Sequence, residues 1–195
     1  MIRIGVLSLQ GGVEEHLQML RALPAVEVRT FTRPSELAGL DAVILPGGES
    51  TAIGKLAVEN GLMDALRSRI IEGMPVWGTC AGMILLAREI RNDKRRHLAV
   101  MDITVDRNGY GAQLESFVSK IPIDGIEGGP FPLVFIRAPR ILVVGPGVRV
   151  MASLNGEPIA CVQDAMVATA FHPELSGDTR FHRWFVELAR TSNRG

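Results

Sequence analysis

Four short apolar runs in this chain lack the alternation of polar and apolar residues that marks a strand with one face in water. They are residues 3–9, 42–45, 75–77 and 166–171. After the first run, Val13, Leu17 and Leu20 recur at the spacing of an amphipathic helix. Apolar strands joined by such helices form a parallel sheet that is covered on both faces. The sequence therefore predicts an α/β fold of three layers, with a mostly parallel central sheet flanked by helices.

The second half of the chain has a different pattern. Strand-like segments follow one another without helices between them, at residues 100–105, 114–120, 134–136, 141–144, 148–154 and 158–162. Such a succession indicates antiparallel strands added at one edge of the sheet. Further helices are expected at residues 61–71, 84–90 and 179–190, and a further strand at residues 26–31.

Length and composition limit what the chain can be. Its 195 residues, 47% of them hydrophobic and 22% charged, suffice for one substantial core, so a single domain over residues 1–195 is expected. The formal net charge is zero, which gives no sign of binding to nucleic acid or to an anionic membrane. No apolar run approaches the ~20 residues that span a bilayer, and two cysteines do not make a disulfide framework. We therefore expect a soluble, cytoplasmic protein.

Residues 76–87 join a short apolar run, a turn of small residues that carries Cys80, and a second apolar run of helical character. A strand-to-helix turn flanked by glycines lets a nucleophile project from the top of a sheet. A thiol at a helix N-terminus also meets the positive end of the helix dipole, which favours the thiolate. A buried cysteine that only fills space is the alternative. That alternative is the preferred interpretation of Cys161, which lies in an apolar strand-like run.

A nucleophilic cysteine needs a base and a group that orients the base. His172 and Glu174 follow the last apolar run, and Pro173 between them favours extended backbone. Residues two apart on an extended segment point to the same side, where the carboxylate can fix the tautomer of the imidazole. Cys80, His172 and Glu174 thus form a candidate triad. The remaining histidines are assigned to the surface or to packing: His16, His97 and His182. No cluster has metal-ligand spacing, so neither a metal nor another cofactor is expected.

Ligands of open parallel sheets gather at the carboxyl ends of the strands. Four loops at such ends, residues 10–12, 46–51, 78–80 and 172–174, should therefore converge on one site. In the second loop, paired glycines expose backbone N–H groups, and Ser50 or Thr51 can cap the helix that follows. The N–H groups of Gly48 and Ala81 can together form an oxyanion hole. An ordinary glycine turn before a helix is the alternative interpretation of this loop.

The combination of residues 78–82 with His172, Pro173 and Glu174 resembles the class I, triad-type glutamine amidotransferases. More narrowly, the chain is similar to the glutaminase subunits of pyridoxal 5′-phosphate synthase. The matching segments run nearly end to end, at residues 5–11, 45–51, 78–87, 101–102, 107–108, 135–139 and 171–175. The resemblance implies a flavodoxin-like sheet and hydrolysis of L-glutamine to L-glutamate and ammonia. A synthase partner would receive the ammonia and build pyridoxal 5′-phosphate.

The resemblance also implies roles for individual residues. Cys80 would be the nucleophile, His172 the general base and acid, and Glu174 the group that orients it. The positions that hold glutamine in the family correspond to Gly48, Glu49, Ser50, Arg107, Ile136 and Arg137. By the same resemblance, the glutaminase idles until the synthase docks, and the peptide that joins residues 47 and 48 completes the oxyanion hole only then. Gln10, in the loop beside the site, is the candidate sensor of docking.

Two positions depart from the family's usual pattern. Relatives commonly carry arginine at the position of Ala112 and an acidic residue at that of Val118. These differences leave the triad intact and bear on the neighbouring loop and on partner contacts. The densest basic segment, residues 88–97, is interpreted as a solvated face. Two other functions remain open: a cysteine hydrolase or peptidase acting on a γ-glutamyl substrate, and a non-catalytic subunit that only docks.

Overall fold

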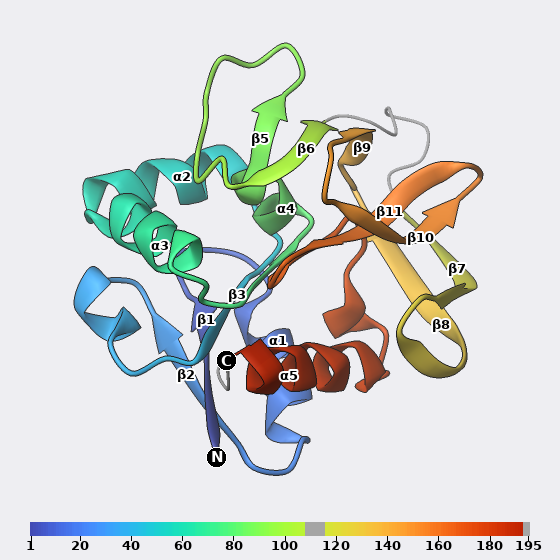
Figure 1. Ribbon diagram of the computed structural model, residues 1–195, viewed down its shortest axis with the longest axis horizontal. Coiled ribbons are helices and arrows are strands. Elements are labelled where there is room, and N and C mark those ends of the chain that lie inside the picture. Colours follow the sequence, from blue (N-terminus) through green and yellow to red (C-terminus); the bar gives the residue numbers. More distant parts are fainter. Residues whose placement is uncertain (108–115, 193–195) are drawn as a thin grey trace.

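A computed structural model of the protein describes residues 1–107 and 116–192 (Figure 1). The helices are α1 (Val13–Arg21), α2 (Ser50–Glu59), α3 (Leu62–Ile71), α4 (Ala81–Leu86) and α5 (Arg180–Ser192), with 3-10 turns η1 (Pro34–Leu37) and η2 (Pro173–Leu175). The strands of the first half are β1 (Ile2–Leu7), β2 (Val26–Phe31), β3 (Ala42–Leu45), β4 (Val76–Thr79), β5 (Ala87–Ile90) and β6 (Met101–Asp106). Those of the second half are β7 (Ser116–Ile123), β8 (Ile126–Ile136), β9 (Arg140–Val144), β10 (Arg149–Leu154), β11 (Glu157–Gln163) and β12 (Met166–Thr169).

The central sheet has seven strands in the order β10-β11-β12-β4-β3-β1-β2. The five strands from β12 to β2 run parallel, with Trp77 of β4 in register with Ile44 of β3 and Val167 of β12. Every residue of β3 and β4 is buried, which explains why these strands show no polar alternation. β11 and β10 extend the sheet antiparallel at one edge. The predictions of a mostly parallel sheet and of antiparallel edge additions are both confirmed.

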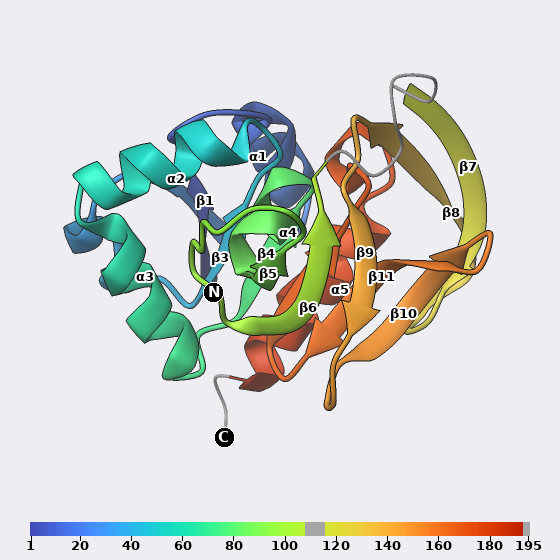
Figure 2. The same ribbon diagram turned by 90° about the horizontal axis from the view of Figure 1, so that it is seen from above.

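Helices cover both faces of this sheet. α1 and α5 contact each other on one face, and α2 contacts α3 and α4 on the other (Figure 1). Seen from above, α2, α3 and α4 lie in front of β1 and β3 (Figure 2). Trp77 shows how the layers meet: its ring stacks on that of Phe181 in α5, with 4.7 Å between the centroids. The next residue, Gly78, faces the opposite layer, where a side chain would overlap the backbone of Gly82 in α4.

The remaining strands do not join the central sheet. β5, β6 and β9 form a three-stranded sheet, and β7 and β8 form an antiparallel hairpin (Figures 1 and 2). The expectation that all of these strands add to one edge is therefore correct only for β10 and β11. The β7–β8 hairpin brings the end of β8 to the central sheet, because the backbone N–H of His172 donates to the carbonyl oxygen of Val134 at 2.8 Å.

The expected helix at residues 84–90 is wrong beyond Leu86. Residues 87–90 form β5, which pairs parallel to β6 and buries Ala87 and Ile90 while exposing the two residues between them. Alanine, arginine and glutamate are good helix formers, so pairing with β6 overrides the local preference. The expected strand at residues 114–120 begins at Ser116 in the described chain, and its first two residues lie outside the described ranges.

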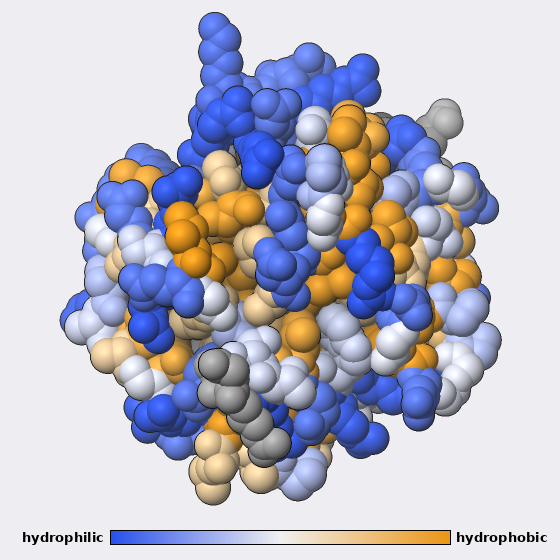
Figure 3. All heavy atoms as spheres, in the orientation of Figure 1, coloured by the Kyte–Doolittle hydropathy of each residue, from blue (hydrophilic) through white to orange (hydrophobic). Residues whose placement is uncertain are grey.

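Hydrophobic and hydrophilic residues are interspersed on the face shown in Figure 3, and hydrophilic residues gather at its top, over the segment between β5 and β6. This region holds much of the basic segment, whose arginines have acidic partners. The ion pairs are Arg88–Asp102, Arg91–Asp106, Arg95–Asp93 and Arg96–Glu89. None of the helices within residues 1–107 and 116–192 has both the length and the apolar character needed to cross a bilayer.

Candidate active site

The four predicted loops do converge, because they follow four neighbouring parallel strands, β12, β4, β3 and β1. The backbone N–H of Gly12 donates to the carbonyl oxygen of Gly47 at 3.1 Å, which joins the loops after β1 and β3. A Cβ atom on Gly47 would lie 2.5 Å from Cε1 of His172 and 3.4 Å from Cβ of Cys80. A Cβ on Gly12 would lie 3.5 Å from Oε1 of Glu174. One site thus contains the triad residues and both glycine loops.

Cys80 sits on a sharp turn between β4 and α4. Its backbone has φ 50° and ψ −105°, a conformation that non-glycine residues adopt rarely and that concentrates at functional sites. The turn is fixed by two hydrogen bonds: Cys80 N–H donates to the Thr169 carbonyl oxygen at 2.8 Å, and Ile84 N–H donates to that of Cys80 at 3.3 Å. A side chain on Gly82 would overlap the carbonyl oxygen of Leu45, so the turn needs glycine there. The predicted sharp turn from strand to helix at Cys80 is present.

His172 and Glu174 are side by side, as the spacing predicts. Nδ1 of His172 lies 2.7 Å from Oε1 of Glu174, so the imidazole donates its Nδ1 proton to the carboxylate. Burial lowers the pKa of His172, but hydrogen bonding to Cys80 and to Glu174 and the negative charge of Glu174 outweigh it, raising the pKa to about 10. His172 is therefore protonated on both ring nitrogens at neutral pH, next to the sulfur of Cys80 and an ionised carboxylate.

Glu174 is 4% exposed and remains ionised despite its burial. Burial raises the pKa of its carboxyl group, while the neighbouring His16 and the hydrogen bond and charge of His172 lower it further than burial raises it. The result is a carboxylate that holds the His172 ring in one orientation. Cys161, by contrast, is fully buried in β11, and burial raises the pKa of its thiol to about 12. The prediction that Cys161 belongs to the core is confirmed.

Three of the residues expected to hold a ligand or sense docking surround the start of α2. The N-cap of α2 is Glu49, whose carboxylate accepts from the N–H groups of Thr51 at 3.1 Å and Ala52 at 2.7 Å. The expectation that Ser50 or Thr51 caps this helix is therefore wrong, because the carboxylate one residue earlier takes that position. Glu49 also pairs with Arg107 at 2.7 Å, and its N–H donates to Oε1 of Gln10 at 2.9 Å.

The other expected ligand positions lie beside these. Ser50 is 2% exposed, and its hydroxyl has no hydrogen-bond partner among the described residues. Ile136, at the end of β8, places its carbonyl oxygen 3.9 Å from Sγ of Cys80. Arg137 follows with φ 44°, in the left-handed region. Ala81 is the first residue of α4, so its N–H lacks an acceptor within the helix. Ala112 and Asn108 lie outside the described ranges, and Val118 on β7 is 69% exposed.

Two residues that the sequence assigned to surface or packing are fully buried beside the triad. Nε2 of His16, on α1, lies 3.4 Å from Oε2 of Glu174, and Nδ1 of His16 lies 2.9 Å from Nε2 of His182 on α5. One signal could have found His16: α1 starts directly after the loop of β1, so its first turn lies near the carboxyl ends of the strands. Nothing in the sequence connects His182 to this region.

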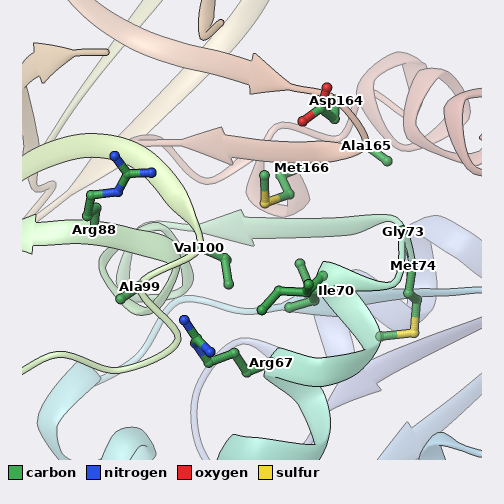
Figure 4. A pocket seen from close by; sticks show the side chains of 11 residues that line it. Arg67, Ile70, Gly73, Met74, Arg88, Ala99, Val100, Asp164, Ala165 and Met166 are labelled. Atoms are coloured by element: carbon green, nitrogen blue, oxygen red, sulfur yellow. The ribbon is translucent and has the colours of Figure 1, made fainter. Parts of the chain in front are cut away.

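The pocket in Figure 4, about 460 Å³ in volume, is a different feature. Met74 precedes β4 and Asp164 precedes β12, so this pocket lies at the amino ends of the strands that carry Cys80 and His172 at their other ends. It contains none of the candidate site residues. This pocket is therefore separate from the candidate triad.

Comparison with known proteins agrees with the geometry. Residues 6–191 match the model of the SNO glutamine amidotransferase family. The chain is a member of the SNO glutamine amidotransferase family.

Relatives of known name support this membership over nearly the whole chain. A protein of Ruminiclostridium cellulolyticum named pyridoxal 5′-phosphate synthase subunit PdxT is 51% identical over 188 residues, which cover 96% of this chain and 100% of the relative. A crystal structure titled glutamine amidotransferase matches with a TM-score of 0.91 and 45% identity, covering 96% of this chain and 98% of that one. A putative GMP synthase protein of Thermoplasma acidophilum, 19% identical over 100% of this chain and 96% of its own, shares the fold with a TM-score of 0.70.

Proposed function

We propose that this member of the SNO family is the glutaminase subunit of a pyridoxal 5′-phosphate synthase. It hydrolyses L-glutamine to L-glutamate and ammonia, and the ammonia passes to a synthase partner. The observation that carries the proposal is the strained turn of Cys80 beside the 2.7 Å pair of His172 and Glu174. Residues 1–195 would act as one glutamine amidotransferase domain, working in the cytoplasm and without a cofactor.

The reaction begins with attack of Cys80 Sγ, as the thiolate, on the side-chain amide carbon of glutamine. A proton on His172 is available at neutral pH because its pKa is about 10, and it goes to the departing nitrogen. The C–N bond breaks, ammonia leaves, and a thioester joins Sγ to the glutamyl group. His172, now neutral, takes a proton from water as the water oxygen attacks the thioester. Cleavage of the C–S bond releases glutamate and restores the thiolate and the imidazolium.

Negative charge builds on the amide oxygen during both attacks and needs preorganised donors. The N–H of Ala81 is one donor, since it lies at the start of α4 next to the nucleophile. The N–H of Gly48 is the second, from the loop whose Gly47 approaches both Cys80 and His172. Removal of one such donor typically costs 10²- to 10³-fold in rate.

The charged ends of glutamine find partners of opposite sign around the same loop. Glu49 would accept the α-ammonium group, and Arg107 and Arg137 would bind the α-carboxylate. Glu49 and Arg107 pair with each other at 2.7 Å, so glutamine replaces an existing ion pair with two new ones. The hydroxyl of Ser50, which has no partner within the described part of the chain, and the carbonyl oxygen of Ile136 supply further polar contacts.

Control by the synthase is also part of the proposal. The carbonyl oxygen of Gly47 accepts from Gly12 N–H, and the side chain of Gln10 accepts from Glu49 N–H. Both bonds connect the loop after β1 to the oxyanion loop. Reorienting the peptide between Gly47 and Gly48 breaks the first bond, at a cost of about 1 kcal/mol that a docked partner can supply. A partner that contacts Gln10 would thereby act directly on the oxyanion loop.

The test measures ammonia released from glutamine by the chain alone and with its cognate synthase, for wild type, Cys80→Ala and His172→Asn. The proposal predicts rapid release by wild type with the synthase, slow release without it, and almost none from either variant. Equal rates with and without the synthase would contradict the proposed control. Release from γ-glutamyl peptides but not from glutamine would favour the hydrolase alternative. Unchanged ammonia production by Cys80→Ala in the complex would favour a docking subunit.

A further inference from the structure

Behind the triad lies a pair of histidines from the two ends of the chain. His16 on α1 and His182 on α5 are both 0% exposed, and α1 contacts α5 on one face of the sheet (Figure 1). Trp77 packs against both rings, with centroid distances of 5.6 Å to His16 and 4.9 Å to His182. The core thus fixes the position of both rings, and His16 lies next to both His182 and Glu174.

The second carboxylate oxygen of Glu174 lies next to this pair. Oε1 accepts from His172, but Oε2 is buried and has no hydrogen-bond partner among the described residues. Nε2 of His16 lies 3.4 Å from Oε2, slightly beyond the usual N–H···O range. Catalytic hydrogen bonds are often long in structures without substrate and shorten in the reacting complex. Nε2 of His16 also lies 3.3 Å from the Thr79 hydroxyl, but an ionised carboxylate is the stronger acceptor.

The tautomers of the two histidines follow from their contacts. Burial lowers the pKa of both, so each ring is neutral and carries one N–H. With the proton of His16 on Nε2, facing Glu174, its Nδ1 accepts from Nε2–H of His182 at 2.9 Å. Nδ1 of His182 is then unprotonated, which fits the lack of a partner for it among the described residues. The reverse arrangement buries an unsatisfied N–H on His182 and turns a lone pair of His16 toward the negatively charged carboxylate.

We propose that His16 is a positioning residue of the triad: its Nε2–H holds the second oxygen of Glu174, and His182 fixes the tautomer that makes this possible. The inference rests on the proposed glutaminase function. The carboxylate is then held through both oxygens, by His172 on one side and His16 on the other. This clamp fixes the plane of the carboxylate, and with it the orientation of the His172 ring toward Cys80. A rotation of the carboxylate would turn the imidazole away from the sulfur.

The clamp also favours the ionised form of Glu174. The groups that face Glu174 are His172 on its own segment, His16 with Glu15 behind it on α1, Cys80 beyond His172, and His182 on α5 beyond His16. His16 places its Nε2 3.4 Å from Oε2, while His172 bonds to the other oxygen, Oε1. Loss of its N–H therefore leaves a buried carboxylate oxygen uncompensated and raises the pKa of Glu174. The acidic limb of the pH–rate profile then moves toward neutral pH.

The test compares three variants in the complex with the cognate synthase. His16→Leu removes the donor, His16→Gln keeps an N–H at a similar distance along the side chain, and Phe185→Leu is the packing control. Phe185 is fully buried on α5, and its ring centroid lies 5.5 Å from that of Trp77, but it has no polar group. We expect His16→Leu to lower kcat by about 10- to 100-fold with little change in KM, as loss of a supporting hydrogen bond does elsewhere. The acidic limb of its pH–rate profile should shift to higher pH. His16→Gln should restore most of kcat and the wild-type position of that limb.

Phe185→Leu should lower the Tm while leaving kcat and the acidic limb near those of wild type. If His16→Leu behaves like Phe185→Leu, or if His16→Gln is no better than His16→Leu, the positioning role is overturned. The wild type in the same assay tests the function on which the inference rests. An inactive wild type overturns both, whereas an active wild type with an unaffected His16→Leu overturns only the role of His16.

Nitrogen chemical shifts of labelled histidine test the arrangement without an activity assay. Both His16 and His182 should appear as neutral Nε2–H tautomers at pH 7 in the folded protein. A proton on Nδ1 of His16 would contradict the proposed hydrogen bond to Glu174, whatever the kinetics show.

Discussion

Replacement of Gly47 by alanine is expected to disable the site without unfolding the protein. The added Cβ would lie 2.5 Å from Cε1 and 3.2 Å from Nδ1 of His172. Carbon atoms in contact prefer about 3.5–4.0 Å, so the imidazole must retreat by about 1 Å. A misplacement of that size can cost about 100-fold in rate, which corresponds to about 2.7 kcal/mol of transition-state stabilisation. Gly47 has no positive φ, so the backbone itself tolerates alanine.

The assay is kcat for ammonia release from glutamine in the complex with the synthase, together with the Tm of the variant. We expect kcat to fall by about 100-fold while the Tm stays close to that of wild type. Gly12→Ala is the matched control in the adjoining loop, because its Cβ would make an ordinary contact of 3.5 Å with Glu174. Gly12→Ala should therefore lower kcat far less than Gly47→Ala does. If Gly47→Ala kept full activity, the close approach of this loop to His172 would be refuted.

Three further predictions concern charge and burial in the same site. His172 has a pKa raised to about 10, so its contribution to stability is fully present below about pH 6.5 and is lost as the pH rises toward 10. The free energy of unfolding, measured in urea, should differ less between wild type and His172→Asn at pH 10 than at pH 6.5. A difference that grows with pH would contradict the raised pKa of His172. Iodoacetamide should label Cys80 in the folded protein and the fully buried Cys161 only after denaturation, as peptide mass spectrometry can check. Glu49→Gln should raise KM for glutamine about tenfold with a smaller change in kcat, because a charged partner of the α-ammonium group is lost; steady-state kinetics would reject this if KM stayed constant.

The parts of the fold that the sequence predicts are those fixed by local pattern. The apolar runs that became β3 and β4 are buried on both faces, so their composition alone identifies them. Cys80, His172 and Glu174 follow directly after such strands, and parallel topology brings strand ends together. Prediction of the candidate triad therefore requires only the order of the strands and helices and a turn of small residues.

Most of the parts that the sequence does not predict depend on contacts between residues that are far apart in the chain. Residues 87–90 prefer a helix locally and become a strand because β6 pairs with them. Glu49 is the N-cap of α2 because its carboxylate reaches two N–H groups. Serine and threonine are commoner at this position, so the sequence pointed to the residues that follow Glu49. His16 and His182 lie 166 positions apart in the chain, and only the packing of α1 on α5 brings them together behind Glu174.

The most direct measurement of the central claim is the covalent state of Cys80 during turnover. The chain, mixed with its synthase and glutamine, is quenched in acid, digested and analysed by mass spectrometry. We expect a γ-glutamyl group on the peptide that contains Cys80. Cys80→Ala should show no such adduct and release almost no ammonia. Ammonia release by Cys80→Ala at the wild-type rate, with no adduct on the wild-type protein, would contradict the central claim.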